Sequence, residues 1–509
     1  MFKKMNFRKI VSYIMILFLL LSIIPIVYCG FFDYANGDDL LGAVAAHTAL
    51  KQGKGFFGYF AAVIEATRQN FLLWDGNFAS TFVWYAFEPS IFGERWYAIV
   101  PVLGYFFVGF CTGCFIHYFL KKYLKFDKYV ILMVCSVTLF FIFHYSPYIT
   151  SLLFWWTGMV SYIFPLGLSW IAFILMDKYL SLQRSRYIVF LSLIMIFVSG
   201  AGYFSIILDI EVFIILFLYQ SFVKKSLFVK WRALLIPFSI LVIGFGVSFF
   251  APGNSARAAS EGTDIGMSFG KIVQTVVQCI ITGNKEGLHR FISIRPLFLF
   301  VLVLCVLGIR FIDVSDLKFE FRYPIGIAIL IDLMYCSVYA PKIFAGVETS
   351  GGVYDVIFIY FLLSIGMIIL YLTGWFKRKV GNGILNGKLS DMTFVNKYIC
   401  IPCTLFVVIF CLAFGKHLIG NSAGYLCYDF ISTGRLNDFR NQMKERIDIL
   451  ESDEKIIILP QMSDDQGPFM HMPIVENPDG YANYATKLFY FKDSVIAIPR
   501  NEWNELYGG

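Results

Sequence analysis

The sequence predicts an all-α polytopic membrane protein with about 11 transmembrane helices, and two observations lead to this fold class. Of the 509 residues, 58% are hydrophobic and only 15% are charged, whereas soluble proteins carry about 25% charged residues. Apolar runs of roughly 18 residues or more recur along the chain, and each is long enough to cross a hydrocarbon core of roughly 30 Å. This composition excludes a soluble multi-domain enzyme, a disordered chain and a secreted disulfide scaffold.

The apolar runs set the order of the elements. They predict spans near residues 10–29, 97–120, 129–147, 160–178, 187–202, 204–222, 232–250, 292–312, 323–341, 354–376 and 397–415. The first run follows a basic N-terminus like that of a signal peptide, but its apolar core exceeds the roughly 15 residues typical of one. We therefore expect it to be a retained span. At 199–202 two spans meet with almost no loop. The alternative is one long helix, which would reverse the orientation of everything downstream, and the charge pattern after it argues against that.

Positively charged residues predict the orientation. They occupy alternate connections, beginning with the N-terminus: Lys3, Lys4, Arg8, Lys9; Lys121, Lys122, Lys125, Lys128; Lys178, Arg184, Arg186; Lys224, Lys225, Lys230, Arg232; Arg310, Lys318, Arg322; and Lys377, Arg378, Lys379, Lys388. Loops rich in Lys and Arg are cytoplasmic. The sequence thus predicts a multi-pass protein of the cell membrane with a cytoplasmic N-terminus and an external C-terminus. Because the net charge of +7 is spread over these loops, no nucleic-acid partner is expected.

Three longer segments lie outside the predicted spans, all on the external face. Loops 30–96 and 251–291 belong to a transmembrane domain of residues 1–415, and residues 416–509 form an external C-terminal α/β element. Within that element the pattern predicts a helix at 433–450 and strands at 455–460 and 494–498.

The first external loop opens with three carboxylates, Asp33, Asp38 and Asp39. Carboxylates placed this close together repel one another and raise each other's pKa, which favours a functional role. The alternative is that Asp38 is the N-cap of a helix ending near Gly53. The amphipathic stretch 55–73 and the aromatic-rich stretch 74–92 are expected to lie at the membrane interface.

The second external loop and its neighbours supply cations. Arg257 follows Pro252-Gly253-Asn254, a turn expected to fix its direction. The other candidate ligands for a phosphate group are Lys271, Arg290, Arg295 and Lys342. Arginine binds phosphate oxygens bidentately, although simple solvation of these side chains remains the alternative.

Other residues stand out within or beside the spans. Trp155 and Trp156 are either part of an aromatic belt at headgroup level or a platform for a sugar ring. Asp209 lies inside a predicted span, where a carboxylate marks a functional site by default, with a structural pairing as the alternative.

Cysteine spacing adds little to the functional argument. The pairs Cys111/Cys114 and Cys400/Cys403 have redox or zinc spacing but lie on predicted membrane helices. There they are expected to act as small hydrophobic residues. The sequence predicts no metal site and does not require a divalent metal, which stays an open alternative.

Several short motifs together resemble a known superfamily. They are Asp38-Asp39 after the first span, Phe154-Trp155-Trp156-Thr157-Gly158, Ala251-Pro252-Gly253-Asn254 and Tyr354-Asp355. With the order of spans and the external tail, they resemble a bacterial branch of the GT-C superfamily of integral-membrane glycosyltransferases.

This resemblance implies a GT-C-like fold and an enzyme that moves a sugar from a polyprenyl-phosphate donor, on the external side of the bilayer. The acceptor would be a cell-envelope polysaccharide or a lipid-linked glycan. It also implies that Asp38 or Asp39 is the catalytic base, with Asp33 ranked below them. The alternatives are a lipid-linked glycan flippase or other transporter, and a glycan polymerase or ligase. The tail has no clear oligosaccharyltransferase signature, so protein glycosylation is not supported.

Overall fold

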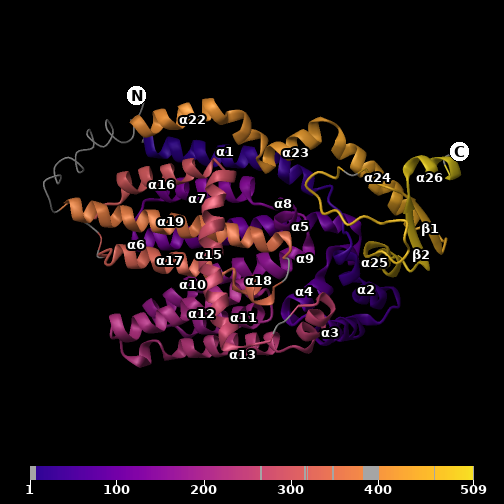
Figure 1. The fold of residues 1–509 in the computed structure, drawn as a ribbon, viewed down its shortest axis with the longest axis horizontal. Helices are drawn as coiled ribbons and strands as arrows, with labels where there is room; N and C mark the ends of the chain where they lie inside the picture. The colour runs from indigo at the N-terminus through magenta and orange to yellow at the C-terminus, as the bar shows by residue number, and fades with distance from the viewer. Residues whose placement is uncertain are drawn as a thin grey trace.

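The computed structural model describes residues 7–263, 266–314, 317, 319–346, 349–381, 401–463 and 465–507. Long helices lie side by side in one bundle, and the C-terminal residues form a small element at one end of it (Figure 1). An all-α multi-pass architecture is therefore supported.

Seven helical segments in the described ranges are long and apolar enough to cross a membrane. They are Arg8–Gly30, Glu94–Tyr123, Lys128–Tyr145, Trp156–Leu182, Tyr203–Val223, Arg232–Phe249 and Gly351–Lys379. An eighth is counted if α15 (Phe269–Ser293) and α16 (Leu297–Phe311), which meet at 98°, form one broken span. The corresponding helices are α1 (Phe7–Gly30), α5 (Ile99–Gly104) with η3 (Tyr105–Cys111) and α6 (Thr112–Tyr123), α7 (Lys128–Tyr145), α10 (Phe164–Leu182), α12 (Tyr203–Leu218), α13 (Leu235–Phe249) and α19 (Gly351–Gly381).

The predicted number of 11 spans is not reached by these length criteria. Two predicted spans are the helices α11 (Ser185–Val198) and α17 (Pro324–Ser337), each of 14 residues, or about 21 Å at 1.5 Å per residue. A third, 292–312, contains only the 15-residue α16. The last, 397–415, begins outside the described residues and continues as α22 (Ile401–Gly420).

One end of the bundle carries the basic connections, and we call it the basic end. Arg8 at the start of α1 bonds to Asp127 before α7 at 3.2 Å. Gln183, between α10 and α11, donates to the Lys230 carbonyl oxygen at 2.9 Å. Connections that the charge pattern assigned to one side of the membrane therefore meet at one end of the bundle.

The opposite end, which we call the capped end, carries the longer loops and the C-terminal element (Figure 1). The first loop forms α2 (Asp38–Lys51), α3 (Gly55–Leu73), α4 (Phe78–Phe87) and η1 (Pro89–Phe92), and the second forms α14 (Pro252–Glu261). Short helices α8 (Ile149–Leu153), α9 (Trp156–Gly158) and α18 (Ala340–Ala345) lie in other connections, and the π-helical segment η4 (Met159–Ile163) leads from α9 into α10. The connection at 199–202 is a turn rather than a continuous helix, and its Gly200 carbonyl oxygen accepts from the Ala79 amide of α4 at 2.8 Å.

The C-terminal element consists of α23 (Ala423–Ser432), α24 (Arg435–Leu450), β1 (Ile456–Pro460), α25 (Tyr481–Phe489), β2 (Ser494–Ile498) and α26 (Arg500–Tyr507). The two strands pair in parallel. The predicted tail helix and both predicted strands are confirmed, whereas α23, α25 and α26 were not predicted.

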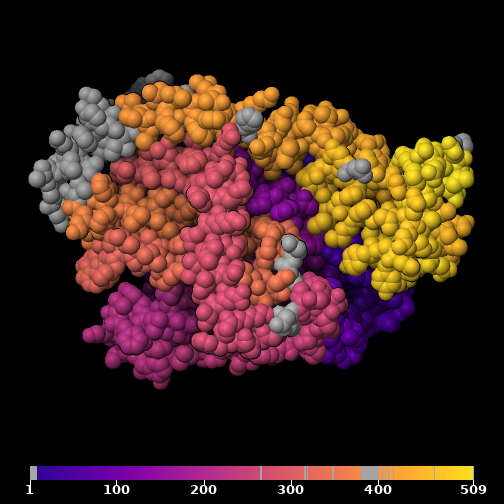
Figure 2. All heavy atoms as spheres, viewed as in Figure 1, coloured from indigo at the N-terminus to yellow at the C-terminus, as the bar shows by residue number. Residues whose placement is uncertain are grey.

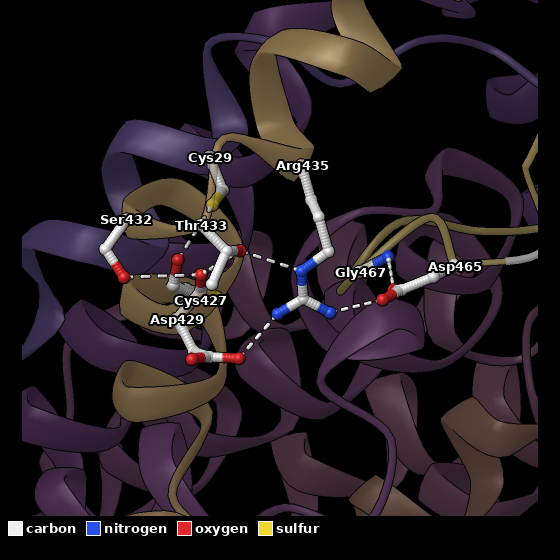
Figure 3. Close-up of polar contacts among 8 residues, drawn as sticks. All are labelled: Cys29, Cys427, Asp429, Ser432, Thr433, Arg435, Asp465 and Gly467. Atoms are coloured by element: carbon white, nitrogen blue, oxygen red, sulfur yellow. Dashed lines mark hydrogen bonds and ion pairs between the residues drawn. The ribbon is translucent and has the colours of Figure 1, made fainter.

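Arg435 holds the start of α24 to its neighbours (Figure 3). Its guanidinium contacts the carboxylates of both Asp429 and Asp465, and its Nε donates to Thr433 Oγ1 at 2.8 Å. Close to this clamp, Cys29 Sγ at the end of α1 lies 4.0 Å from the carbonyl oxygen of Cys427 in α23. The tail is thus packed against the first span.

Candidate functional site

Asp38 is the first residue of α2, and its carboxylate does not cap that helix. Gly37 takes the N-cap position with φ +40°, and no side chain makes a capping bond there. The Tyr481 hydroxyl from α25 donates to Asp38 Oδ1 instead. The N-cap alternative is therefore wrong. Partial burial raises the pKa of Asp38, an effect that the Tyr481 hydrogen bond opposes, so this partly exposed carboxylate is a stronger base than usual.

Asp39 is enclosed, with an exposed fraction of 0%. Its Oδ1 accepts from the Thr157 amide at 2.9 Å and from Thr157 Oγ1 at 2.6 Å, and its Oδ2 accepts from the Tyr97 hydroxyl. Burial is the main reason that the pKa of Asp39 is raised to about 7. These bonds tie the start of α2 to α9 and leave no oxygen of Asp39 facing solvent.

Two further carboxylates lie beside Asp39. Asp33 is 4% exposed and Glu88 is 0% exposed. Asp33 Oδ2 and Glu88 Oε1 have no hydrogen-bond partner in the described part of the chain, and burial together with the charge of Asp39 raises the pKa of both side chains. Sequence reasoning missed Glu88, although a charge immediately before Pro89 in an aromatic-rich stretch is a signal for it. Among the described residues, no group of three His, Cys, Asp or Glu side chains has the arrangement of a metal site.

Arg257 lies in the second turn of α14 rather than beyond a free turn, because Pro252 is the first residue of that helix. Its Nε donates to Glu261 Oε1 at 2.8 Å, and its guanidinium lies 4.9 Å from the centre of the Trp74 ring. The expectation that a turn directs Arg257 is corrected: the helix and the Trp74 ring direct it.

The Ala251-Pro252-Gly253-Asn254 motif joins the second external loop to the first. Asn254 Oδ1 accepts from the Gly76 amide at 3.0 Å, while its Nδ2 donates to the Ser248 carbonyl oxygen at 2.8 Å. A Cβ atom on Gly253 would lie 2.7 Å from the Phe71 carbonyl oxygen, so only glycine permits this approach. The motif therefore positions Arg257 over the first loop.

These contacts gather a group of ionisable residues at the capped end, which we call the polar site: Asp38, Asp75, Tyr85, Tyr162 and Arg257. Tyr162 lies within electrostatic range of Asp38, Asp75 and Arg257. Burial and the charges of Asp75 and Asp38 raise the pKa of Tyr85. In the space-filling view, the yellow C-terminal element lies against the indigo helices of the first loop (Figure 2). The polar site thus combines a carboxylate base with a cation held over an aromatic ring.

The other predicted phosphate ligands do not join the polar site as one cluster. Lys271 lies 4.5 Å from the Phe344 ring of α18, and Lys342 of the same helix donates to the Tyr354 hydroxyl at 2.6 Å. Lys271 therefore lies beside α18, the helix that carries Lys342.

Arg290 and Arg295 are further along the chain than Lys271. Arg290 is 19 residues, or roughly 28 Å of helix, from Lys271 on α15; it is only 7% exposed and lies beside the rings of Phe358 and Phe361. Arg295 lies 5.6 Å from the Phe414 ring. The alternative that Arg290 is simply solvated is wrong, because this side chain is buried among aromatic rings.

The remaining candidates are packed in the interior. Trp155 and Trp156 are 6% and 3% exposed, so neither indole is available as a surface belt or as an open sugar platform. Asp209 is fully buried, and its Oδ2 accepts from Ser169 Oγ at 2.9 Å, as the structural alternative expects. Its Oδ1 has no hydrogen-bond partner among the described residues. Cys111 is likewise buried, and Cys400 lies outside the described residues.

No protein-family model, no curated protein and no solved structure matches this chain.

Proposed function

We propose that the protein is a membrane glycosyltransferase that moves a sugar from a polyprenyl-phosphate donor to a cell-envelope glycan or lipid-linked acceptor. The reaction takes place at the capped end, which faces outward in this proposal. The observation that carries it is the polar site, where the partly exposed Asp38 and the Trp74-stacked Arg257 are brought to one region by Asn254.

The chemistry assigns separate roles to these two residues. The Asp38 carboxylate accepts the proton of an acceptor hydroxyl, whose oxygen forms the new bond to the anomeric carbon while the bond from that carbon to the donor phosphate oxygen breaks. Arg257 stabilises the negative charge left on the phosphate, because a planar guanidinium binds two phosphate oxygens at once. Arg257 Nε donates to Glu261 Oε1 at 2.8 Å, and the donor phosphate would compete with Glu261 for the guanidinium.

Asp39 has a supporting role in this proposal. Its oxygens are already committed to Thr157 and Tyr97, so it cannot approach an acceptor without breaking these bonds. It keeps α2 against α9 and thereby fixes the position of Asp38.

The surface around α15 suits a lipid-linked donor. Ile272, Val276 and Ile280 on α15 are exposed, whereas Cys279 and Gly283 face the protein. A helix that turns its large apolar side chains outward is compatible with contact to acyl or polyprenyl chains.

We further infer that 11 helices traverse the bilayer with the N-terminus inside. The short helix α11 begins beside the basic connection at Arg184 and ends at the turn that contacts α4 at the capped end. Similarly, α17 begins after Arg322, whose carbonyl oxygen accepts from Tyr371 of α19, and ends near α18. Both helices therefore run between the same two ends as the seven longer spans.

The test is transfer of a labelled sugar from a polyprenyl-phosphate donor by the full chain reconstituted in liposomes. Transfer that is abolished in Asp38→Asn supports the proposal. A chain that instead moves intact lipid-linked glycan between leaflets, with no transfer, would identify the flippase alternative.

A further inference from the structure

A cavity of about 230 Å³ lies between the first loop and the C-terminal element. The first loop contributes Tyr34, Leu40 and Ser90, and the C-terminal element contributes Arg446, Gln461 and Gln466. Its size is that of a single sugar ring rather than an oligosaccharide. The proposed catalytic base Asp38 does not line it, so the reaction proposed above leaves the cavity unexplained.

Arg446 is the central feature of this cavity. Its side chain lines the cavity, is 7% exposed, and makes no hydrogen bond or ion pair with any residue that the structure describes. Burial, followed by the nearby charge of Arg500, lowers the pKa of Arg446 to about 10, an effect that the charge of Glu445 opposes, so the side chain still carries its charge at neutral pH. A buried cation without a partner is costly, and an anion in the cavity would remove that cost.

The neutral polar groups of the cavity supply hydrogen-bond acceptors. The amide nitrogen of Gln461 donates to the Ala497 carbonyl oxygen, and that of Gln466 donates to the Ser463 carbonyl oxygen, each at 3.5 Å. These bonds leave both amide oxygens available to accept from hydroxyl groups. Leu40, Ile447 and Leu450 also line the wall and provide an apolar surface. The wall includes one carboxylate, Glu94, which accepts from the Tyr490 hydroxyl at 3.0 Å.

We infer that this cavity binds one carboxylate-bearing sugar residue, a uronic acid. The Arg446 guanidinium pairs with the carboxylate, the two glutamine oxygens accept from ring hydroxyls, and the apolar wall contacts the C–H face of the ring. Binding in the cavity is independent of the reaction; only the role of this sugar as part of the acceptor glycan rests on the proposed function.

The experiment measures binding of glucuronate, glucose and inorganic phosphate to the full chain in lipid nanodiscs by titration calorimetry, with no donor present. Glucuronate is expected to bind at least about 10-fold more tightly than glucose, and Arg446→Gln to weaken glucuronate roughly 10- to 100-fold. Arg446→Lys should recover only part of the affinity, because the planar fork is lost.

Two further variants make the result specific to the cavity. Lys444→Gln removes an exposed cation two residues away on the same helix and should leave glucuronate binding unchanged. Met443→Trp keeps Arg446 but fills space in the cavity that Met443 lines, and it should abolish binding even if Arg446→Gln fails to fold.

Equal affinity for glucose and glucuronate would overturn the inference, as would full binding in Met443→Trp. Binding of phosphate but not glucuronate, lost in Arg446→Gln, would make the cavity a phosphate site and overturn the sugar assignment. Because no donor is present, loss of sugar transfer in Asp38→Asn does not bear on these measurements. Glucuronate binding can therefore fail while sugar transfer succeeds, and sugar transfer can fail while glucuronate binding succeeds.

Discussion

Replacing Asp38 with asparagine is expected to remove the general base while preserving the shape of the polar site. Asparagine has the same size as aspartate, and its amide oxygen can still accept from the Tyr481 hydroxyl that now donates to Asp38. What the variant loses is the ability to take a proton from the acceptor. A positioned general base contributes typically 10²–10⁴-fold, so transfer should fall by that factor, or by roughly 3–5 kcal/mol in the barrier.

The same substitution should cost little folding stability. One charge-assisted hydrogen bond becomes a neutral one, which changes stability by about 1 kcal/mol, and Asp38 is partly exposed. The variant should therefore accumulate in the membrane at nearly the wild-type level. Asp39→Asn differs, because the Asp39 carboxylate accepts from three donors in a fully buried position, and this variant should accumulate poorly.

The assay is initial-rate transfer of a labelled sugar in liposomes, normalised to protein and measured across a pH series on both sides of neutrality. Tyr481→Phe serves as the matched control. It removes the hydrogen bond that opposes the raised pKa of Asp38, so the ionised form is less favoured and the acid limb of the rate profile should move to higher pH. A wild-type rate in correctly accumulated Asp38→Asn would refute the base assignment, and an unmoved acid limb in Tyr481→Phe would show that another group titrates.

Four further outcomes are expected. Arg257→Ala should raise the donor concentration needed for the half-maximal rate far more than the acceptor concentration, and Arg257→Lys should give an intermediate value. If a two-substrate titration shows unchanged donor dependence, the phosphate site lies elsewhere. Asn254→Ala should reproduce the Arg257→Ala donor defect while leaving the guanidinium in place, because the two loops are no longer joined; normal donor kinetics would contradict this positioning role. The pKa of Asp39 is about 7 when the chain is folded and about 3.9 when it is unfolded. The contribution of Asp39 to folding stability is therefore highest below about pH 4 and falls by about 4 kcal/mol as pH rises through 7. Thermal unfolding measured over this pH range should show this dependence in the wild type and a weaker one in Asp39→Asn. Finally, in a background whose native cysteines do not react, a membrane-impermeant reagent should label Ser260→Cys but not Lys379→Cys from outside, and labelling of both would reject the proposed topology.

The local sequence pattern predicted most of the helices and strands. The amphipathic stretch 55–73 is α3 with the predicted bounds, and the tail strands lie within a residue of their predicted positions. Apolar runs and basic connections also predicted which loops would meet at one end of the bundle. These features depend on residues that are near one another in the chain, so periodicity and charge are enough to find them.

The candidate site required the tertiary structure. The carboxylates of Asp38 and Asp39 are alike in sequence, yet Asp39 is enclosed by Thr157 and Tyr97, whereas Asp38 meets Tyr481 more than 400 residues further along the chain. Burial and hydrogen bonding, which separate a base from a structural carboxylate, are set by these distant partners.

The sequence by itself thus determined the multi-pass membrane class, the order of the apolar helices and the alternation of basic connections between them. The tertiary structure decided which carboxylate is accessible, that Asn254 joins the two loops, and that Arg446 lines a cavity. The physical reason is that hydropathy and charge act through local composition, whereas solvent access and hydrogen-bond partners depend on which distant segments pack together.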